Sequence, residues 1–189
     1  MNNIFRQIIF VCACIATTGF SSLSLATDTR SNNNPHAQNP SDNTVSSILN
    51  ATPEASIFVS ALKISDHWNT ITESSEVTIF IPTNDALQTE GSAFLLEAVL
   101  IKPENRERLE KLMDLHILRA SFQIDSNSTS PMEIPIDNGN CLPVKNSMDS
   151  IIIGPQAVVT KTLKAKNGYI YLLDHLLWEP YKDKTECLL

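Results

Sequence analysis

The sequence predicts an α+β domain in which helices come first and antiparallel strands follow. Three observations support this fold class. Apolar residues recur at helical spacing between residues 42 and 116. Short runs rich in β-branched and aromatic residues then extend from residue 117 to residue 174. Within this second part, Asn167-Gly168 separates two such runs, which is typical of a β-hairpin with a two-residue turn.

The helical part begins with two capped segments. Asp42 can cap a short first helix whose apolar face lies within residues 45–49. Thr52-Pro53-Glu54 supplies an N-cap, a proline in the first turn and an early acidic residue for a second helix. We expect that helix to bury apolar side chains between residues 57 and 62.

A strand and a capped turn come next. Residues 77–81 form an apolar, β-branched run that Pro82 ends. Thr83, Asn84 and Asp85 then read as the cap of a helical turn, which makes this corner rigid; a binding role is the alternative. Two further helices are expected over residues 91–101 and 104–115.

His116 lies on the apolar stripe of the helix over residues 104–115, beside Leu112 and Met113. This position predicts a core histidine held by one hydrogen bond, with a ligand or catalytic base as the alternative. The strands expected after it cover residues 117–122, 132–136, 142–145, 150–153, 157–165 and 169–174.

The last two strands form the predicted hairpin. A type I′ turn at Asn167-Gly168 pairs Lys166 with Tyr169, and Lys161 with Asp174. One face then faces the core, and the other is a mixed surface that can meet water. The core face holds Leu163, Ala165, Ile170 and Leu172; the other face holds Thr162, Lys164, Lys166, Tyr169, Tyr171 and Leu173.

Asp174 falls on the core-facing side at the far end of this hairpin. An isolated carboxylate in a core is unfavourable unless it is paired. Lys161 across the ladder, or backbone N–H groups of the following turn, would satisfy it. We therefore expect Asp174 to be a structural anchor rather than a catalytic acid.

The N-terminus predicts export. Residues 1–26 have a basic start, an apolar run and small residues before a cleavage site after Ala26, as in a secretory signal peptide. A loose lipobox ending at Cys14 suggests a lipoprotein alternative, which the short spacing from Arg6 disfavours. Residues 27–41 hold no large apolar residue and read as a disordered tether. The domain is expected over residues 42–181 and a C-terminal tail over 182–189.

Signal removal would leave Cys141 and Cys187 as the cysteines of the mature chain. In an oxidising compartment the two suggest one disulfide, which would contribute roughly 4 kcal/mol in the chain-entropy model. Two unpaired thiols are the alternative. A redox-active pair is disfavoured because no Cys-x-x-Cys spacing occurs.

Charge and motifs exclude several classes of function. The formal net charge is −7, or −8 once Arg6 leaves with the signal, and no basic cluster is present. This disfavours nucleic acid and anionic membranes as partners and favours neutral or locally basic ones. Nucleophile elbows, zinc-protease motifs and phosphate-binding glycine loops do not occur in the sequence. We therefore predict no catalytic residue, no cofactor and no metal site.

Three segments resemble motifs of the fasciclin domain family. Residues 78–87 resemble its first motif, a strand running into Pro-Thr-Asn, and residues 112–118 resemble its tyrosine-histidine motif. Residues 167–180 resemble the last motif, with Asn-Gly, an aspartate and a closing proline. The resemblance implies a wedge of antiparallel strands with helices packed against it, in a secreted or surface-attached adhesion protein. The positions that match the motifs are Thr83, Asn84, Asp85, His116, Asn167, Gly168 and Asp174.

Two positions depart from the family pattern. Leu115 stands where the motif usually has tyrosine, and Tyr171 stands where the last motif often has histidine. Leucine lacks the hydroxyl and aromatic face of tyrosine, so adhesion through that motif does not carry over directly. Tyr169, Tyr171 and Trp178 could instead form an aromatic platform for a sugar or a peptide, although packing against Lys164 and Lys166 explains the tyrosines equally well.

The function that these observations predict is binding. We expect a monomeric, non-catalytic adhesion module, secreted or periplasmic, whose partner is a surface protein or a glycan. The alternative is a small periplasmic redox or enzyme-accessory protein that uses Cys141 and Cys187 or a pocket near His116. A structural envelope protein without a dedicated ligand is a third interpretation.

Overall fold

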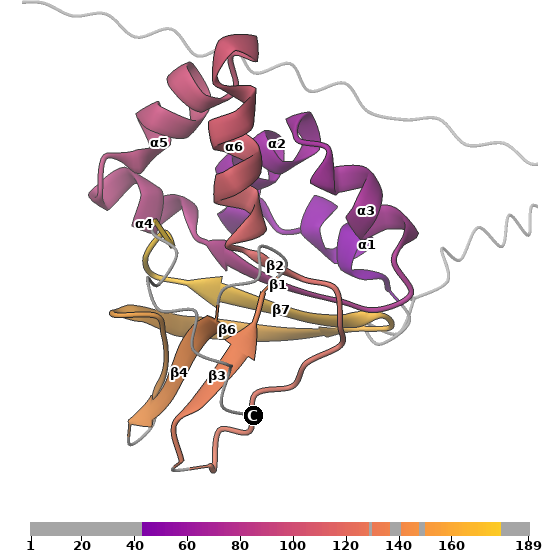
Figure 1. Cartoon of the computed structure of the whole chain (residues 1–189), viewed down its shortest axis with the longest axis vertical. Coiled ribbons are helices and arrows are strands. Elements are labelled where there is room, and N and C mark those ends of the chain that lie inside the picture. Colours follow the sequence, from indigo (N-terminus) through magenta and orange to yellow (C-terminus); the bar gives the residue numbers. More distant parts are fainter. Residues whose placement is uncertain (1–42, 129, 137–140, 148–149, 179–189) are drawn as a thin grey trace, which may run out of the picture. The chain divides into compact units, whose positions relative to one another are not determined.

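Along the chain, helices come before and after the strand β1 (Val77–Pro82), and most of the strands follow them; the helices lie together on one side of the sheet strands β1 and β7 (Gly168–Leu173) (Figure 1). The computed structural model describes residues 43–128, 130–136, 141–147 and 150–178. The predicted signal peptide, tether, domain limits and tail lie outside these residues. The helical elements are α1 (Val45–Asn50), η2 (Pro53–Ala55), α2 (Ser56–Ile64), α3 (His67–Glu73), α4 (Asn84–Thr89), α5 (Ser92–Phe94), the π-helical η3 (Leu95–Leu100), η4 (Pro103–Asn105) and α6 (Arg106–Asp114). The strands are β1 (Val77–Pro82), β2 (Ile117–Leu118), β3 (Met132–Pro135), β4 (Cys141–Ser147), β5 (Ser150–Ile153), β6 (Ala157–Ala165) and β7 (Gly168–Leu173).

Threonine side chains cap two of the helices. Thr44 Oγ1 accepts a hydrogen bond from Ser47 N at the start of α1. The predicted cap, Asp42, lies outside the described residues. Thr83 Oγ1 accepts from Ala86 N at the start of α4, so this predicted cap is present. A threonine cap of this kind contributes about 1 kcal/mol to helix stability.

The seven strands form one sheet in the order β2-β1-β7-β6-β5-β4-β3. This arrangement confirms the α+β class, with helices before most of the strands. The sheet is mostly antiparallel, as expected, but β1 and β7 run parallel from Val77↔Gly168 to Pro82↔Leu173. The long chain between β1 and β7, with several helices and the other strands, allows them to pair side by side in the same direction. As a result, the C-terminal ends of β1 and β7 lie side by side at the same end of the sheet.

The hairpin has a different register from the predicted one. Ala165 pairs with Gly168, so Lys166 and Asn167 form the turn, and Lys161 pairs with Leu172 rather than with Asp174. Hydrogen bonds from Asn167 to two distant parts of the chain explain the shift in register. Asn167 Oδ1 accepts from Val45 N at 2.8 Å and Asn167 Nδ2 donates to Ser74 O at 3.1 Å.

Gly168 is needed for its place in the sheet rather than for the turn. A Cβ on this residue would lie 1.7 Å from the carbonyl oxygen of Val77, its neighbour in β1. Its φ of +150° is also one that residues with side chains rarely adopt. The glycine therefore permits the close approach of β7 to β1.

Both faces of β7 are buried, which corrects the expectation of a water-facing side. Helices cover the face that holds Ile170 and Leu172, each at most 1% exposed (Figure 1). The opposite face holds Tyr171, also 1% exposed, stacked on Phe80 with ring centroids 5.5 Å apart. Residues 120–124, which we call the crossing segment, run over this second face.

Hydrogen bonds hold the crossing segment in place. Thr78 Oγ1 donates to Ala120 O at 2.7 Å and accepts from Phe122 N at 2.8 Å. Tyr171 Oη accepts from Ile124 N at 2.8 Å and donates to the Phe122 carbonyl at 3.1 Å. These bonds explain why β2 ends at Leu118 and not at the predicted residue 122.

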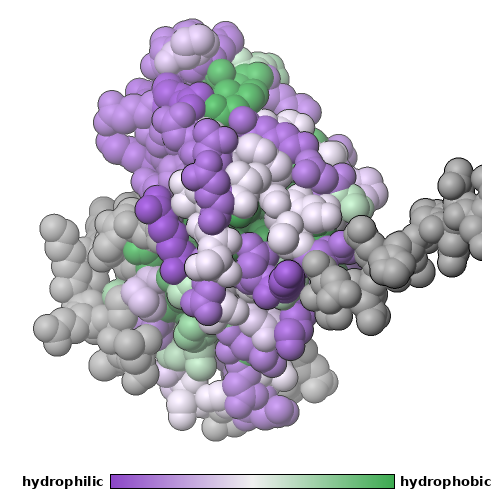
Figure 2. Space-filling model, turned by 90° about the vertical axis from the view of Figure 1, so that its right-hand side faces the viewer, coloured by the Kyte–Doolittle hydropathy of each residue, from purple (hydrophilic) through white to green (hydrophobic). Residues whose placement is uncertain are grey.

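The face of the molecule that carries α1 and α3 is largely polar. Seen from the side of α1 and α3, hydrophilic residues predominate and hydrophobic ones occupy small separate areas (Figure 2). In the described part of the chain, no helix has the length and hydropathy needed to cross a bilayer.

Candidate functional site

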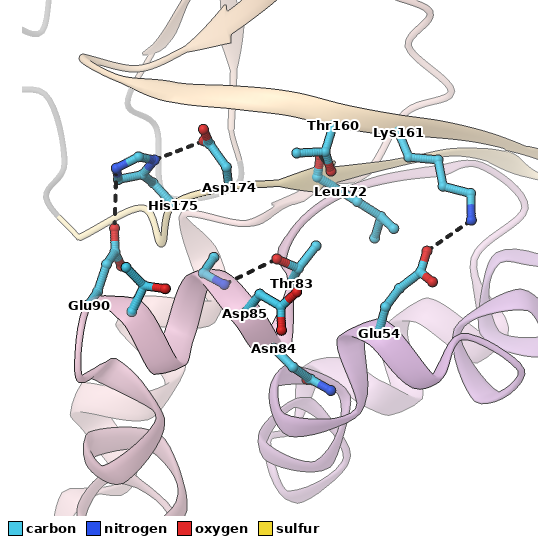
Figure 3. Close-up of a pocket in the computed structure, with 12 residues that line it drawn as sticks. Glu54, Thr83, Asn84, Asp85, Glu90, Thr160, Lys161, Leu172, Asp174 and His175 are labelled. Atoms are coloured by element: carbon cyan, nitrogen blue, oxygen red, sulfur yellow. Dashed lines mark hydrogen bonds and ion pairs between the residues drawn. The ribbon is translucent and has the colours of Figure 1, made fainter.

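A cleft of about 600 Å³ lies where β1 and β7 end side by side (Figure 3). Because these strands are parallel, the residues that follow Pro82 and Leu173 leave the sheet at the same edge. Thr83 N donates to Leu173 O at 2.9 Å, which ties the two exits together. The lining residues are Glu54, Thr83, Asn84, Asp85, Ala86, Thr89, Glu90, Thr160, Lys161, Leu172, Asp174 and His175.

The α4 side of the cleft is built from three predicted motif residues. Thr83 is the helix cap described above. Asn84 Oδ1 accepts from Ile57 N at 3.0 Å and Asn84 Nδ2 donates to Pro53 O at 2.9 Å, so this side chain joins α4 to the start of α2. Asp85 is exposed in the first turn of α4. The first two side chains are used by the fold, and the third remains available to a ligand.

The β7 side presents Asp174 and His175. Asp174 Oδ1 accepts from Val158 N at 2.6 Å and lies 2.8 Å from His175 Nδ1. The donor therefore lies in β6, whereas the sequence predicted Lys161 or the backbone N–H groups of the turn after Asp174. The carboxylate is also less buried than predicted, since 38% of the Asp174 side chain is exposed. Asp174 therefore anchors β7 to β6 through one oxygen and still faces the cleft.

The β6 side depends on a bulge. The register shifts between Val159 and Lys161, which leaves Thr160 unpaired in the ladder, and Thr160 Oγ1 donates to Leu172 O at 3.1 Å. A bulge redirects side chains that would otherwise alternate between faces, and here both Thr160 and Lys161 line the cleft. Lys161 Nζ reaches Glu54 Oε1 at 2.9 Å across it (Figure 3).

The charges in the cleft are mainly negative. Carboxylates come from Glu54, Asp85, Glu90 and Asp174, whereas the cationic or titratable groups are Lys161 and His175. Glu90 Oε2 accepts from Leu176 N at 3.3 Å, and Glu90 Oε1 lies 3.8 Å from His175 Nε2. The arrangement suits a polar or cationic group. No group of three or more potential metal-ligating side chains occurs among the described residues.

Comparison with known proteins identifies the family. The model of the fasciclin domain matches residues 53–180, more than half of the chain. The chain belongs to the fasciclin domain family. This confirms the resemblance noted from the sequence motifs, and the matched range contains every lining residue of the cleft.

Individual relatives of this fasciclin domain come from a bacterium and an insect. Protein sll1483 of Synechocystis is 26% identical over 125 residues, which cover 66% of this chain and 67% of the relative. Fasciclin-1 of Drosophila melanogaster is 26% identical over 124 residues, 59% of this chain but only 18% of that protein. A solved FAS1 domain pair from the insect cell adhesion molecule fasciclin I shares the fold, with a TM-score of 0.52 at 22% identity, over 68% of this chain and 46% of that one.

His116 lies away from the cleft and is fully buried. Its Nδ1 donates to Leu112 O at 2.7 Å, and its Nε2 accepts from Leu177 N at 3.4 Å. The Phe58 ring packs 4.7 Å from the imidazole, centroid to centroid. Burial lowers the pKa of His116 from 6.5 to about 4, against a smaller opposing effect of the Leu112 bond. The histidine is therefore neutral and joins α6 to the segment after β7.

The proposed aromatic platform is not formed. Tyr171 is buried under the crossing segment, and Tyr169 Oη donates to Gln123 Oε1 at 2.6 Å. The Trp178 side chain is 45% exposed. Residues of the crossing segment thus contact the two tyrosines that were expected to contact a ligand. The exposure of this pair could not be predicted because the sequence pattern does not reveal the crossing segment.

The predicted disulfide stays a prediction. Cys141 is buried in β4 at 8% exposure, and Cys187 lies outside the described residues.

Sequence reasoning missed a polar cluster between α3 and α6. His67 Nδ1 lies 2.7 Å from Glu110 Oε2, and His67 Nε2 lies 2.6 Å from Asp114 Oδ1. Arg106 pairs with Glu110 and with Asp66. The spacing of Arg106, Glu110 and Asp114 by four residues could have revealed one charged helix face. It could not have revealed that His67 packs against it.

Proposed function

We propose that this fasciclin domain is a secreted or periplasmic, non-catalytic binding module that attaches to a surface protein or a glycan through the cleft at the ends of β1 and β7. The observation that carries the proposal is the convergence there of Asp85 and Asp174, two positions of different family motifs. The insect relative is described as a cell adhesion molecule, which supports an adhesive role here.

The chemistry of the cleft favours a partner with basic or hydroxyl-rich groups. Asp85 offers an exposed carboxylate, and the Glu54–Lys161 ion pair is itself exposed, with side chains 44% and 53% accessible. Exposed ion pairs contribute only about 0–1 kcal/mol. A basic group of a partner can therefore take the place of Lys161 beside Glu54 at little cost.

The reactive groups of the cleft support binding rather than catalysis. The Thr83 hydroxyl accepts a backbone N–H, and the Thr160 hydroxyl donates to a backbone carbonyl. Neither lies in a hydrogen bond with His175, so no nucleophile is paired with a base in this arrangement.

The test uses the mature protein, residues 27–189, immobilised and probed with a glycan array and a panel of purified surface proteins. Asp85→Asn removes one charge from the cleft, and we expect it to weaken binding about two- to fivefold. Glu97→Gln is the matched control, because Glu97 is exposed on η3 and does not line the cleft. Equal binding by both variants would contradict the role of the cleft, and no binding to either panel would contradict the function.

The proposed export of the protein can be tested separately from its binding. The secreted protein should begin at Thr27, as read by N-terminal sequencing. It should also show no free thiol when denatured without reductant, because Cys141 and Cys187 would be paired. Retention of the N-terminal residues, or two titratable thiols, would count against an exported, disulfide-bonded protein.

A further inference from the structure

Among the residues that the structure describes, the outer edge of β6 has no strand partner along most of its length. β5 pairs with β6 only at Val158 and Ala157. From Val159 to Ala165, the described residues supply a strand partner only on the β7 side. In Figure 1, β3 and β4 run at a steep angle to β6 and β7 and point away from them. Backbone groups on such an edge can pair with another chain.

The hairpin register indicates which groups point outward. Ala165 and Gly168 close a two-residue turn, so Ala165 and Leu163 exchange hydrogen bonds with β7. By the alternation of an antiparallel ladder, the N–H and C=O groups of Thr162 and Lys164 point away from β7. The same edge already receives one backbone contact, because Lys166 N donates to Asn43 O at 2.8 Å. An added strand could continue this pairing along β6 through the outward-pointing backbone groups of Lys164 and Thr162, which recur at every second residue.

A hollow of about 350 Å³ provides space for an added chain where β5 and β6 separate. Its walls come from both strands and from the loop after the crossing segment. The lining is mainly hydroxyl, amide and aliphatic: Ser126, Asn127, Ser150, Ile151, Val159, Thr160, Lys161 and Thr162. The bulge at Thr160 lies at this point, and bulges increase the local twist that turns an edge away from its neighbour.

The charge of the edge selects among possible occupants. Lys164 and Lys166 are exposed, and no ion pair joins either of them to an acid in the described part of the chain. Edge lysines oppose unspecific strand pairing, and a second copy of this edge would bring lysine against lysine. A strand with acidic side chains would instead gain favourable cross-strand pairs.

We propose that the open edge of β6, from Thr160 to Lys166, binds an extended acidic peptide by β-strand addition. The backbone of Thr162 and Lys164 supplies the hydrogen bonds, and the lysines select acidic residues at facing positions. This surface meets the cleft of the proposed function at Thr160 and Lys161, but Thr162, Lys164 and Lys166, which carry the proposal, do not line the cleft.

The experiment titrates the mature protein with a labelled synthetic peptide of alternating glutamate and threonine or valine, at low salt. Amide hydrogen exchange by NMR follows Thr162 and Lys164. Their exchange is expected to be fast in the free protein and to slow at least about tenfold with peptide, as for newly formed ladder bonds. Lys164→Glu should weaken the peptide about tenfold, whereas Lys102→Glu, a charge reversal at an exposed lysine on another surface, should not.

Two further arms separate strand addition from simple charge attraction. The same peptide with alternate backbone amides N-methylated keeps its charges but loses donors, and it should bind at least about tenfold more weakly. Asp85→Asn in the cleft should leave the peptide affinity unchanged. Equal binding of the methylated peptide, or unprotected amides in the complex, would overturn the proposal. So would amides of Thr162 and Lys164 that are already protected in the free protein and become exposed when residues 27–42 are deleted.

Discussion

Acidification from pH 7 to pH 4 is expected to destabilise this fasciclin domain through His116. The histidine is fully buried, and both ring nitrogens bond to backbone groups, Leu112 O and Leu177 N. Protonation would place a charge in the core and replace the Nε2 acceptor with a donor that faces the N–H of Leu177. The unfolded chain binds this proton near pH 6.5, whereas the folded chain binds it only near the lowered pKa of about 4.

The magnitude follows from the difference between these two pKa values. Between pH 6.5 and pH 4 the unfolded state holds more protons, so the free energy of unfolding falls as the pH falls. A lowering of about 2.5 pH units at His116 corresponds to a loss of about 3 kcal/mol by pH 4. For a domain with a typical stability of about 5–15 kcal/mol, this loss is a large fraction of the total.

The variant that isolates this effect is His116→Gln. Glutamine can donate to a carbonyl but does not titrate, and it lacks the ring that packs on Phe58. We expect a loss of about 1–2 kcal/mol at pH 7 and a weaker pH dependence than in the natural protein. The two stability curves should therefore cross between about pH 6 and pH 5, and the variant should be the more stable protein by about 1–2 kcal/mol at pH 4.

The assay is urea unfolding monitored by circular dichroism at half-unit steps from pH 7 to pH 4. Ile79→Val is the matched control, since it should remove about 0.5–1.5 kcal/mol from the core at every pH without changing a titrating group. The carboxylates titrate in the same range, and they should contribute equally to the pH dependence of the free energy of unfolding in all three proteins. A stability difference between the natural protein and His116→Gln that stays constant across the range would refute the reasoning.

Two further predictions concern β7. Gly168→Ala forces a Cβ into the Val77 carbonyl, so we expect a loss of more than about 4 kcal/mol or failure to fold, measured by urea unfolding or soluble yield. Tyr171→Phe removes a hydroxyl that bonds two backbone groups of the crossing segment, and it should destabilise the fold by about 1–3 kcal/mol. Faster amide exchange at Ile124 should accompany the second change, and unchanged exchange there would argue against this role of the hydroxyl.

Much of the local structure follows from short stretches of sequence. The cap at Thr83 depends on residues within one helical turn, and the burial of His116 follows from the apolar stripe that it shares with Leu112 and Met113. These interactions lie within a few positions along the chain, where helical periodicity and side-chain chemistry are decisive. The α+β class follows from the same patterns.

The candidate site depended on contacts that local patterns do not encode. Parallel pairing of β1 with β7 brings Asp85 and Asp174 into the lining of one cleft, and Thr160 and Lys161 at the bulge of β6 line it as well. In the hairpin, the tertiary bonds of Asn167 outweigh the preference of Asn-Gly for a type I′ turn. The sequence by itself determined most of the helices and strands, because those depend on near neighbours. Only the tertiary structure decided register, strand direction and the composition of the cleft, because the partners are distant in the chain.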